Sequence, residues 1–374
     1  MTAAVTRIVT PAQAPAWHVV GHAEAKSLLA DERIGMSHPE PAKAPWYATD
    51  DVSGRPRGGS ETEYLEHAEW RRAMTKVFSP AKLAAAAAST RGFAETILAG
   101  LQDRPQPVDL NAEYAIPLCS RIIFQVLDVP DSELETVQGW TDQGATTGDV
   151  DKSLMGMKAL LAFATRLVRE RRDGDGTDAV SELIRAGRAG GSGGDGGRVV
   201  KLVAGMLAFG RETPASALSN GLVLLLKHRE QRERLQADPA LVPGAVEEML
   251  RLFHPPAATP HGLLRYAHDD VESGGERIAK GDMVLIDIAR ANFDRRTFAD
   301  PEAFDITRTP NPHLTFGSGF YMCNFAKLAR LELGAAVSVV FERLPKLELA
   351  VAAESLRRKT HLRTRAIEEL PVTW

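Results

Sequence analysis

The sequence predicts a mainly α-helical protein with small β-sheet regions. Apolar residues recur three and four positions apart through most of residues 63–252, whereas short strand-like segments joined by a glycine turn follow at residues 261–294. Hydrophobic residues make up 44% of the 374 residues, enough for a sizeable core. Because no internal repeat interrupts this pattern, we expect residues 1–374 to form one large domain.

The elements follow one another in a simple order. A strand and a short helix are expected within residues 18–34, and Pro80 is a plausible first residue of a new helix. A turn is expected at the Ser-Gly-Gly-Glu segment, residues 273–276, and a helix after Cys323 extends through Phe341. Further helices are predicted at residues 63–80, 82–101, 117–130, 152–173, 178–187, 198–235 and 244–256.

The predicted helix at residues 198–235 is apolar on nearly all sides and is therefore expected to be buried. A polar interruption, Arg211-Glu212-Thr213, precedes Pro214, and the proline predicts a bend in this helix because it cannot donate the helical amide bond. The glycine-rich residues 187–197 are interpreted as a linker. A phosphate-binding loop is disfavoured because no strand precedes it and no Gly-Lys-Ser/Thr sequence follows.

Composition excludes several classes of protein. A net charge of −4 and a pI near 6.2 give no global attraction to nucleic acid or to an anionic membrane. The two cysteines are too few for a disulfide framework, so we expect a reduced, cytoplasmic protein. No signal peptide and no stretch of about 18 uninterrupted apolar residues is visible.

Cys323 follows two closely spaced glycines and precedes a helix-like run. It could be a small buried hydrophobe, a nucleophile or a thiolate ligand of haem iron, whereas zinc is disfavoured because the second cysteine is distant in sequence. Gly317 and Gly319 allow tight bends, and a helix N-terminus stabilises a thiolate. Phe316, among other aromatic and apolar neighbours, offers an apolar wall for a flat macrocycle. These local features leave the nucleophile and the haem ligand equally open.

The segment from Phe316 through Gly317 to Cys323 resembles the haem-binding signature of the cytochrome P450 family, and the following Ala-Lys-Leu-Ala-Arg-Leu-Glu-Leu is similar to the helix after the ligand in its bacterial members. Further resemblances occur in the expected order between about His67 and Leu349. This resemblance implies a single triangular domain of the cytochrome P450 fold, haem b as the cofactor and Cys323 as the axial ligand of its iron.

The resemblance also implies roles for residues elsewhere in the chain. Glu212 and Thr213 are similar to the acid–alcohol pair that delivers protons at the oxygen site, and Glu248 and Arg251 resemble the family's Glu-x-x-Arg pair, completed by Arg308. An ordinary exposed helix pair is the alternative for Glu248 and Arg251. The cofactor-binding residues that it implies are His67, Arg71, Arg265, Phe316, Gly317, Tyr321 and Cys323.

Several residues depart from the family pattern. Tyr321 stands where a histidine or arginine usually binds a propionate, and its hydroxyl brings one hydrogen bond but no charge. Phe325 replaces a glycine. Phe209, Gly210 and Arg211 are candidate substrate-pocket residues, although Arg211 could instead form a salt bridge with a neighbouring helix.

Three functions follow as hypotheses. The first is oxidation of a small-molecule or peptide natural product with O2 and electrons from a ferredoxin or flavodoxin and its reductase. The second is oxidative aryl crosslinking of an aromatic peptide without oxygen insertion, and the third is a non-catalytic haem-binding protein. Substrate selection is expected in loops at residues 37–65 and 140–190. Candidate residues for ferredoxin docking are Arg71, Arg72, Lys76 and Lys327.

Overall fold

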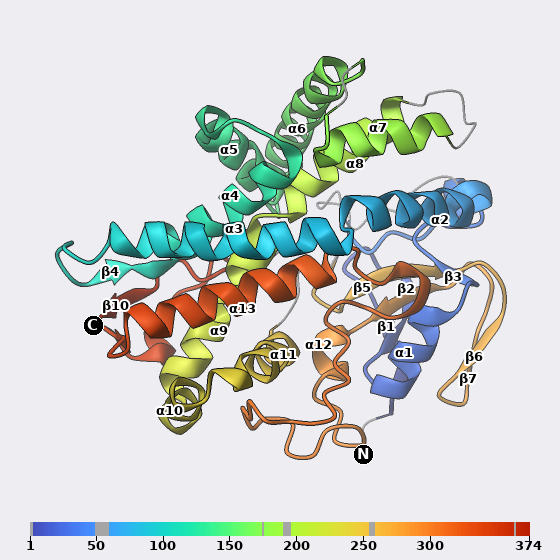
Figure 1. Ribbon diagram of the computed structural model, residues 1–374. Helices are drawn as coiled ribbons and strands as arrows, with labels where there is room; N and C mark the ends of the chain where they lie inside the picture. Colours follow the sequence, from blue (N-terminus) through green and yellow to red (C-terminus); the bar gives the residue numbers. More distant parts are fainter. Residues whose placement is uncertain (1–2, 49–59, 174–175, 190–195, 254–258, 363) are drawn as a thin grey trace.

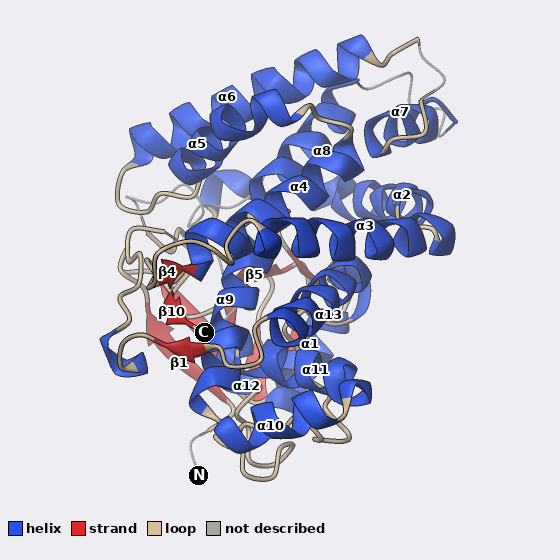
Figure 2. Ribbon diagram, turned by 60° about the vertical axis from the view of Figure 1, so that its left-hand side comes forward, coloured by secondary structure: helices blue, strands red, loops and turns tan. Residues whose placement is uncertain are grey.

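The computed structural model describes residues 3–48, 60–173, 176–189, 196–253, 259–362 and 364–374. The helices dominate (Figures 1 and 2), and the strands form separate small sheets, so the predicted mainly α class is confirmed. The helices are α1 His22–Ala30, α2 Ser60–Val77, α3 Pro80–Ala99, α4 Ile116–Leu127, α5 Leu134–Gly144, α6 Val150–Glu170, α7 Ala179–Ala189, α8 Gly196–Phe209, α9 Glu212–Lys227, α10 Arg229–Ala237, α11 Val242–Leu252, α12 Ile288–Ala291 and α13 Ala326–Arg343. The strands are β1 Val5–Val9, β2 Pro15–Val19, β3 Ile34–Gly35, β4 Val108–Asp109, β5 Leu263–Ala267, β6 Val271–Ser273, β7 Glu276–Ile278, β8 Met283–Ile286, β9 Glu348–Leu349 and β10 Pro371–Thr373. In Figure 1, β4 and β10 lie near the C-terminus and apart from β1, β2, β3 and β5.

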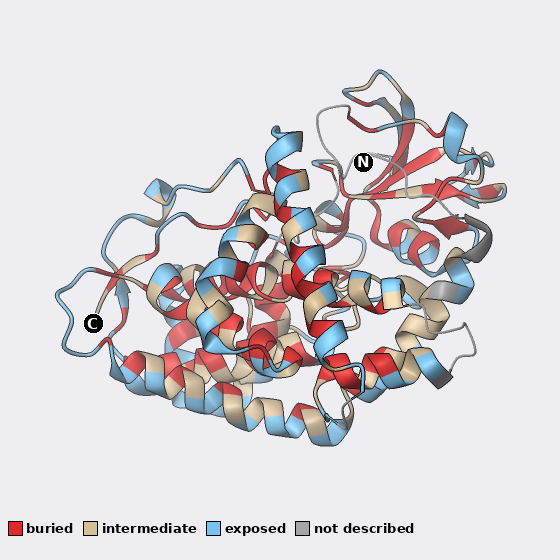
Figure 3. Cartoon of the chain, turned by 90° about the horizontal axis from the view of Figure 1, so that it is seen from above, coloured by how far each residue is buried: buried red, intermediate tan, exposed pale blue. Residues whose placement is uncertain are grey.

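The largest core cluster surrounds α9, which packs against α4, α11 and α13. Leu218, Leu222 and Leu225 of α9 are fully or almost fully buried, as the apolar character of this segment predicts. Helix α13 packs along α3 (Figure 1), and the buried residues lie where the helices meet (Figure 3). This packing holds the N-terminal end of α13, and therefore the segment that carries Cys323, against the body of the molecule.

The prediction of one continuous helix at residues 198–235 is wrong. The structure contains α8, α9 and α10, and the first break lies at Gly210 and Arg211 and not at Pro214. A Cβ atom at Gly210 would lie 2.5 Å from the Met206 carbonyl oxygen and 2.7 Å from Ile123 of α4, so this close approach requires glycine. Pro214 is the third residue of α9, where its missing N–H removes no intrahelical hydrogen bond.

The main sheet has the strand order β1-β2-β8-β5-β3. Strand β2 pairs in parallel with β8, with Ala16 opposite Met283, while β5 pairs antiparallel with β8 and places Arg265 opposite Val284. Strands β6 and β7 form the predicted hairpin, whose turn residues Gly274 and Gly275 have φ values of 60° and 82°. A small sheet of order β4-β10-β9 lies near the C-terminus.

Other sequence predictions are modified by the structure. Helix α7 extends to Ala189 and α8 begins at Gly196, so the linker predicted at residues 187–197 is shorter than expected, and its residues 190–195 lie outside the described residues. The helices predicted at residues 152–173 and 178–187 are present as α6 and α7, so the loops expected between about residues 140 and 190 are limited to the connections of α5, α6 and α7. Residues 49–59 of the other substrate loop and residues 254–258 also lie outside the described residues. Among the described helices, none has both the length and the apolar character needed to cross a membrane.

Candidate functional site

Cys323 lies in a turn that leads into α13. The Cys323 amide donates to the Phe316 carbonyl oxygen at 2.8 Å, and the Gly317 amide donates to the Leu314 carbonyl oxygen at 2.7 Å. Gly317 and Gly319 have φ values of 75° and 65°, in the left-handed region that glycine tolerates best. A Cβ atom at Gly319 would lie 2.5 Å from the Ala30 Cα atom of α1. The glycines therefore permit both the turn and its close packing on α1.

The Cys323 thiol is surrounded by groups with opposing effects on its pKa. Desolvation raises the pKa above the usual value, whereas hydrogen bonds from the backbone amides of Phe325 and Ala326 and the positive charges of Arg330 and Arg71 lower it. A bound metal ion would decide the balance, because a coordinating thiol is deprotonated. The Phe325 ring packs edge-to-face on Phe78 at a centroid distance of 5.1 Å, which accommodates the bulk that replaces glycine.

Helix α2 contributes two nitrogen-bearing side chains, a histidine and an arginine, to the cysteine segment. His67 and Arg71 lie four residues apart and therefore share one face of the helix. The His67 Nε2 atom lies 3.2 Å from the Phe320 carbonyl oxygen, and Arg71 donates to the Phe320 and Met322 carbonyl oxygens at 3.1 Å and 2.8 Å. Desolvation lowers the pKa of His67. The two residues thus bring a donor-rich helix face against the backbone that precedes Cys323.

The Tyr321 ring contacts basic residues of two different elements. Its ring centroid is 4.6 Å from that of His67, and the Arg265 guanidinium carbon of β5 lies 5.6 Å from the Tyr321 centroid. The Tyr321 hydroxyl donates to Glu63 of α2 at 2.5 Å. Burial works to raise the pKa of Glu63, but hydrogen bonds from Met36, Ser37 and Tyr321 outweigh it and lower that pKa.

Glu248, Arg251 and Arg308 form a buried charge network. The side chains of Glu248 and Arg251 are 0% exposed, which excludes the alternative of an ordinary surface pair. Arg251 donates to both Glu248 carboxylate oxygens at 2.8 Å, and Arg308 donates to them at 3.1 and 3.2 Å. Asn311 completes the acceptor sites of Glu248 at 3.0 Å. This network fixes α11 to the segment that leads to Cys323.

The acid–alcohol pair begins α9. Glu212 is buried and accepts a hydrogen bond from the Thr364 hydroxyl, and desolvation raises the pKa of its carboxyl group. Thr213 is partly buried in the same turn. A raised pKa brings a carboxyl group closer to the operating pH, which is the property that a proton-delivery residue needs.

The candidate substrate-pocket residues lie in three different environments. Arg211 is 5% exposed and forms an ion pair with Asp142 of α5, the alternative that the sequence left open. Gly210 packs against Ile123 of α4. Phe209 is 58% exposed at the end of α8 and, of these three residues, keeps its side chain most open to contact.

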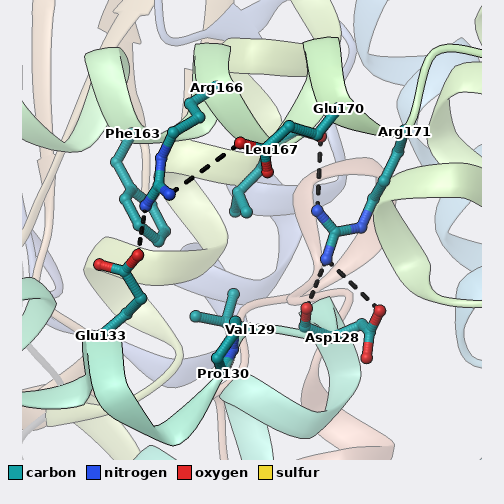
Figure 4. A pocket seen from close by; sticks show the side chains of 9 residues that line it. All are labelled: Asp128, Val129, Pro130, Glu133, Phe163, Arg166, Leu167, Glu170 and Arg171. Atoms are coloured by element: carbon teal, nitrogen blue, oxygen red, sulfur yellow. Dashed lines mark hydrogen bonds and ion pairs between the residues drawn. The ribbon is translucent and has the colours of Figure 1, made fainter.

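A separate surface pocket of about 280 Å³ lies on α6 and the connection between α4 and α5 (Figure 4). Arg166 is paired with Glu133 at 2.6 Å, and Arg171 donates to the Asp128 carbonyl oxygen (Figure 4). Because its arginines already have acceptors, this pocket offers no charge that calls for a ligand.

Comparison with known proteins shows what the whole chain is similar to. The profile of the Cytochrome P450 family matches residues 156–349. Cytochrome P450 BJ-1 of Bradyrhizobium diazoefficiens is 33% identical over 99% of this chain and 92% of its own length. The chain belongs to the cytochrome P450 family. Pentalenolactone synthase of Streptomyces exfoliatus is a further P450 relative, 32% identical over 96% of this chain and 90% of its own length.

Solved P450 structures share the whole fold. The structure of CYP105P1 in complex with filipin I has a TM-score of 0.88 and 31% identity, and the match covers 100% of this chain and 93% of that one. Substrate-free P450 PimD, a polyene macrolide antibiotic pimaricin epoxidase, has a TM-score of 0.85 and 35% identity with the same coverage. This chain therefore has the cytochrome P450 fold, is an oxidoreductase of the monooxygenase type, and has haem b as its cofactor.

The residues around Cys323 fit haem b. The partly exposed sulfur at a helix N-terminus is a suitable axial ligand, and His67, Arg71 and Arg265 are cationic or hydrogen-bonding partners of the kind that two propionates require. These three residues contact the P450 signature segment: His67 lies against the Phe320 carbonyl oxygen, Arg71 donates to the Met322 carbonyl oxygen, and Arg265 lies near the Tyr321 ring.

Sequence reasoning missed three residues that contact the predicted site of this P450. Asp142, Thr364 and Glu63 partner Arg211, Glu212 and Tyr321 across 69, 152 and 258 residues of sequence, respectively. Only Glu63 carried a usable signal, because it lies four residues before His67 and therefore on the same helix face.

Proposed function

We propose that this P450 binds haem b through the Cys323 thiolate and oxidises a small-molecule or peptide natural product with O2. The position of Cys323 carries the proposal, because it lies in a glycine turn at the start of α13 and directly follows a segment that His67, Arg71 and Arg265 contact. The chain acts as one domain in the cytoplasm. Thiolate-ligated haem, when bound, supplies the oxidising chemistry, since the thiolate pushes electron density that favours O–O cleavage.

The protein's own residues then have separate tasks. His67, Arg71 and Arg265 neutralise the propionates. Glu212, whose pKa is raised by burial, passes protons through its carboxyl group, and Thr213 positions water beside it. The Glu248 network keeps the cysteine segment in place. Phe209 is the candidate substrate contact because it is exposed at the end of the broken helix.

A natural-product substrate is supported by the named relatives. Mycinamicin IV hydroxylase/epoxidase of Micromonospora griseorubida is 31% identical over 100% of this chain, and the pimaricin epoxidase and pentalenolactone synthase are similarly related. Electrons arrive from a ferredoxin or flavodoxin with its reductase. The basic residues Arg71, Arg72, Lys76 and Lys327 are the proposed docking contacts for this acidic partner.

The test is the absorption spectrum of the purified protein, reduced and exposed to carbon monoxide. We expect a strongly red-shifted Soret band in the wild type that disappears in Cys323→Ala. The matched control is Cys119→Ala, because Cys119 is buried in α4 and should leave the band intact. Loss of the band in both variants, or wild-type protein that takes up no haem, contradicts the proposal.

Product analysis with a competent redox partner tests the reaction itself. A mass gain of one oxygen supports oxygen insertion, whereas loss of two hydrogens identifies oxidative coupling instead. An intact haem spectrum without turnover of any natural-product substrate leaves a haem-binding protein without catalysis.

A further inference from the structure

Tyr321 stands at the position where the family pattern has a cation for a propionate, and its hydroxyl carries a single proton. That proton is already committed, since the hydroxyl donates to the Glu63 Oε1 atom at 2.5 Å. A tyrosine donates one hydrogen bond, and a propionate carboxylate has none to offer in return. The hydroxyl therefore cannot serve Glu63 and a propionate at the same time.

Glu63 is held as firmly as its partner. Its Oε1 atom accepts from the Met36 amide at 2.7 Å as well as from Tyr321, and its Oε2 atom accepts from the Ser37 amide at 2.8 Å and from the Ser37 hydroxyl. The side chain is 9% exposed. A buried carboxylate with four donors is fully satisfied and will not release one of them without cost.

These contacts join three elements around one carboxylate. Glu63 belongs to α2, Met36 and Ser37 follow β3, and Tyr321 ends the short 3₁₀ helix Gly319–Tyr321 just before Cys323. The Tyr321 ring, fixed in this way, contacts His67 and Arg265.

We propose that Glu63 is a positioning residue of the haem site: it accepts the hydrogen bond of the Tyr321 hydroxyl, fixes the cysteine segment to α2, and leaves the propionates to the hydrogen-bond donors of α2 and β5. Tyr321 then contacts these donor residues through its ring and is not a propionate ligand. This inference rests on the haem site proposed above. It also explains how the chain retains an ordered site after exchanging a cation for a tyrosine.

The test is a double-mutant cycle of Tyr321→Phe and Glu63→Gln, read out as the rate of haem transfer from the ferric protein to excess apomyoglobin. Each single variant should lose haem about tenfold faster, the lower end for a hydrogen bond to a charged group. The double variant should also lose haem about tenfold faster, because both substitutions break the same contact. The control is Tyr64→Phe on α2, whose exposed hydroxyl donates to Glu32 at 3.0 Å and whose loss should not change the rate.

A second arm adds Tyr321→His, which restores the residue type of the family pattern. With Glu63 present, the imidazole should pair with this carboxylate and retain haem no longer than the wild type. In the Glu63→Gln background it should retain haem longer than Tyr321 does.

If the two substitutions act independently, the double variant will lose haem about a hundredfold faster than the wild type. That result overturns the inference and makes Tyr321 a propionate ligand. Tighter haem retention by Tyr321→His with Glu63 present does the same. In both cases the haem spectrum persists, so failure here differs from failure of the proposed function, in which no thiolate-ligated haem forms.

Discussion

Replacing Arg251 with methionine should destabilise the protein far more than the same change at a surface arginine. Arg251 is 0% exposed and donates to both oxygens of Glu248 at 2.8 Å. It also donates to the carbonyl oxygens of Asn292, Pro301 and Ala303, at 3.1, 2.8 and 3.0 Å. Methionine fills similar space but leaves these acceptors without their donor.

The magnitude follows from the buried charge that remains. Removing one partner of a buried ion pair costs about 3–5 kcal/mol. An unfolding entropy of about 2.1 cal/mol/K per residue gives about 0.8 kcal/mol/K for a chain of this length, so a loss of about 4 kcal/mol lowers the Tm by about 5 °C. Arg308 and Asn311 still contact Glu248, and they keep the cost within this range.

The assay is thermal unfolding followed by far-UV circular dichroism at one scan rate. The control is Arg295→Met, because Arg295 pairs with Glu302 at the same 2.8 Å distance but on the surface, where such pairs contribute little. Its Tm should remain within the error of the measurement. Equal Tm values for Arg251→Met and Arg295→Met would refute the reasoning from burial.

Four further outcomes are expected. Gly319→Ala should lower the Tm and speed haem loss, because its Cβ would lie 2.5 Å from the Ala30 Cα atom. Burial works to raise the pKa of Glu247, but the histidine and arginine that pair with this carboxylate lower its pKa to about 2. The stability that the ionised carboxylate contributes is therefore present above pH 4.5 and is lost as the pH falls toward 2. In acid unfolding, Glu247→Gln should lose less stability than the wild type over that range. Because burial raises the pKa of Glu212, ionising it costs stability as the pH rises from 4.5 toward neutrality, and Glu212→Gln should be relatively more stable at pH 7 than at pH 4. Product formation should fall by about a hundredfold in Glu212→Gln and in Thr213→Ala, measured per electron pair consumed.

Matched variants check these outcomes. Gly275→Ala has a φ of 82° but no atom within 4 Å of the added Cβ, so it isolates backbone strain from the packing clash expected at Gly319. If Gly319→Ala and Gly275→Ala lower the Tm equally, the packing clash at Gly319 does not contribute to the loss of stability. Glu369→Gln changes an exposed residue and should lose stability in acid to the same extent as the wild type. If Glu247→Gln also loses as much stability in acid as the wild type, the ion pairs of Glu247 have no role in the loss.

Local motifs made much of the fold and the site predictable from the sequence. The start of α3 at Pro80, the turn at Gly274 and Gly275, and the cysteine segment all depend on residues close together in the chain. The break before α9 was misplaced at Pro214 because local chemistry does not show that Gly210 must pass close to Ile123. Packing between α8 and α4 decided that position, and packing is not local.

The contacts that tune the site were out of reach for the same reason. Thr364 reaches Glu212 across 152 residues of sequence. The sequence indicates Glu212 as one half of a catalytic pair, but it does not show that a residue of the C-terminal segment donates a hydrogen bond to the Glu212 carboxyl group.

The parallel pairing of β2 with β8 has a consequence for the order in which the protein can assemble during synthesis. Ala16 meets its partner Met283 only after more than two-thirds of the chain has left the ribosome. β8 and β5, which carries Arg265, lie between β2 and β3 in the finished sheet, so β2 and β3 belong to no common sheet until both later strands emerge. Although translation proceeds from the N-terminus, this sheet must be completed late, and Cys323 is translated later still. The haem binding proposed for Cys323 therefore belongs to the final stage of biogenesis, after β2 and β3 have waited for β8 and β5.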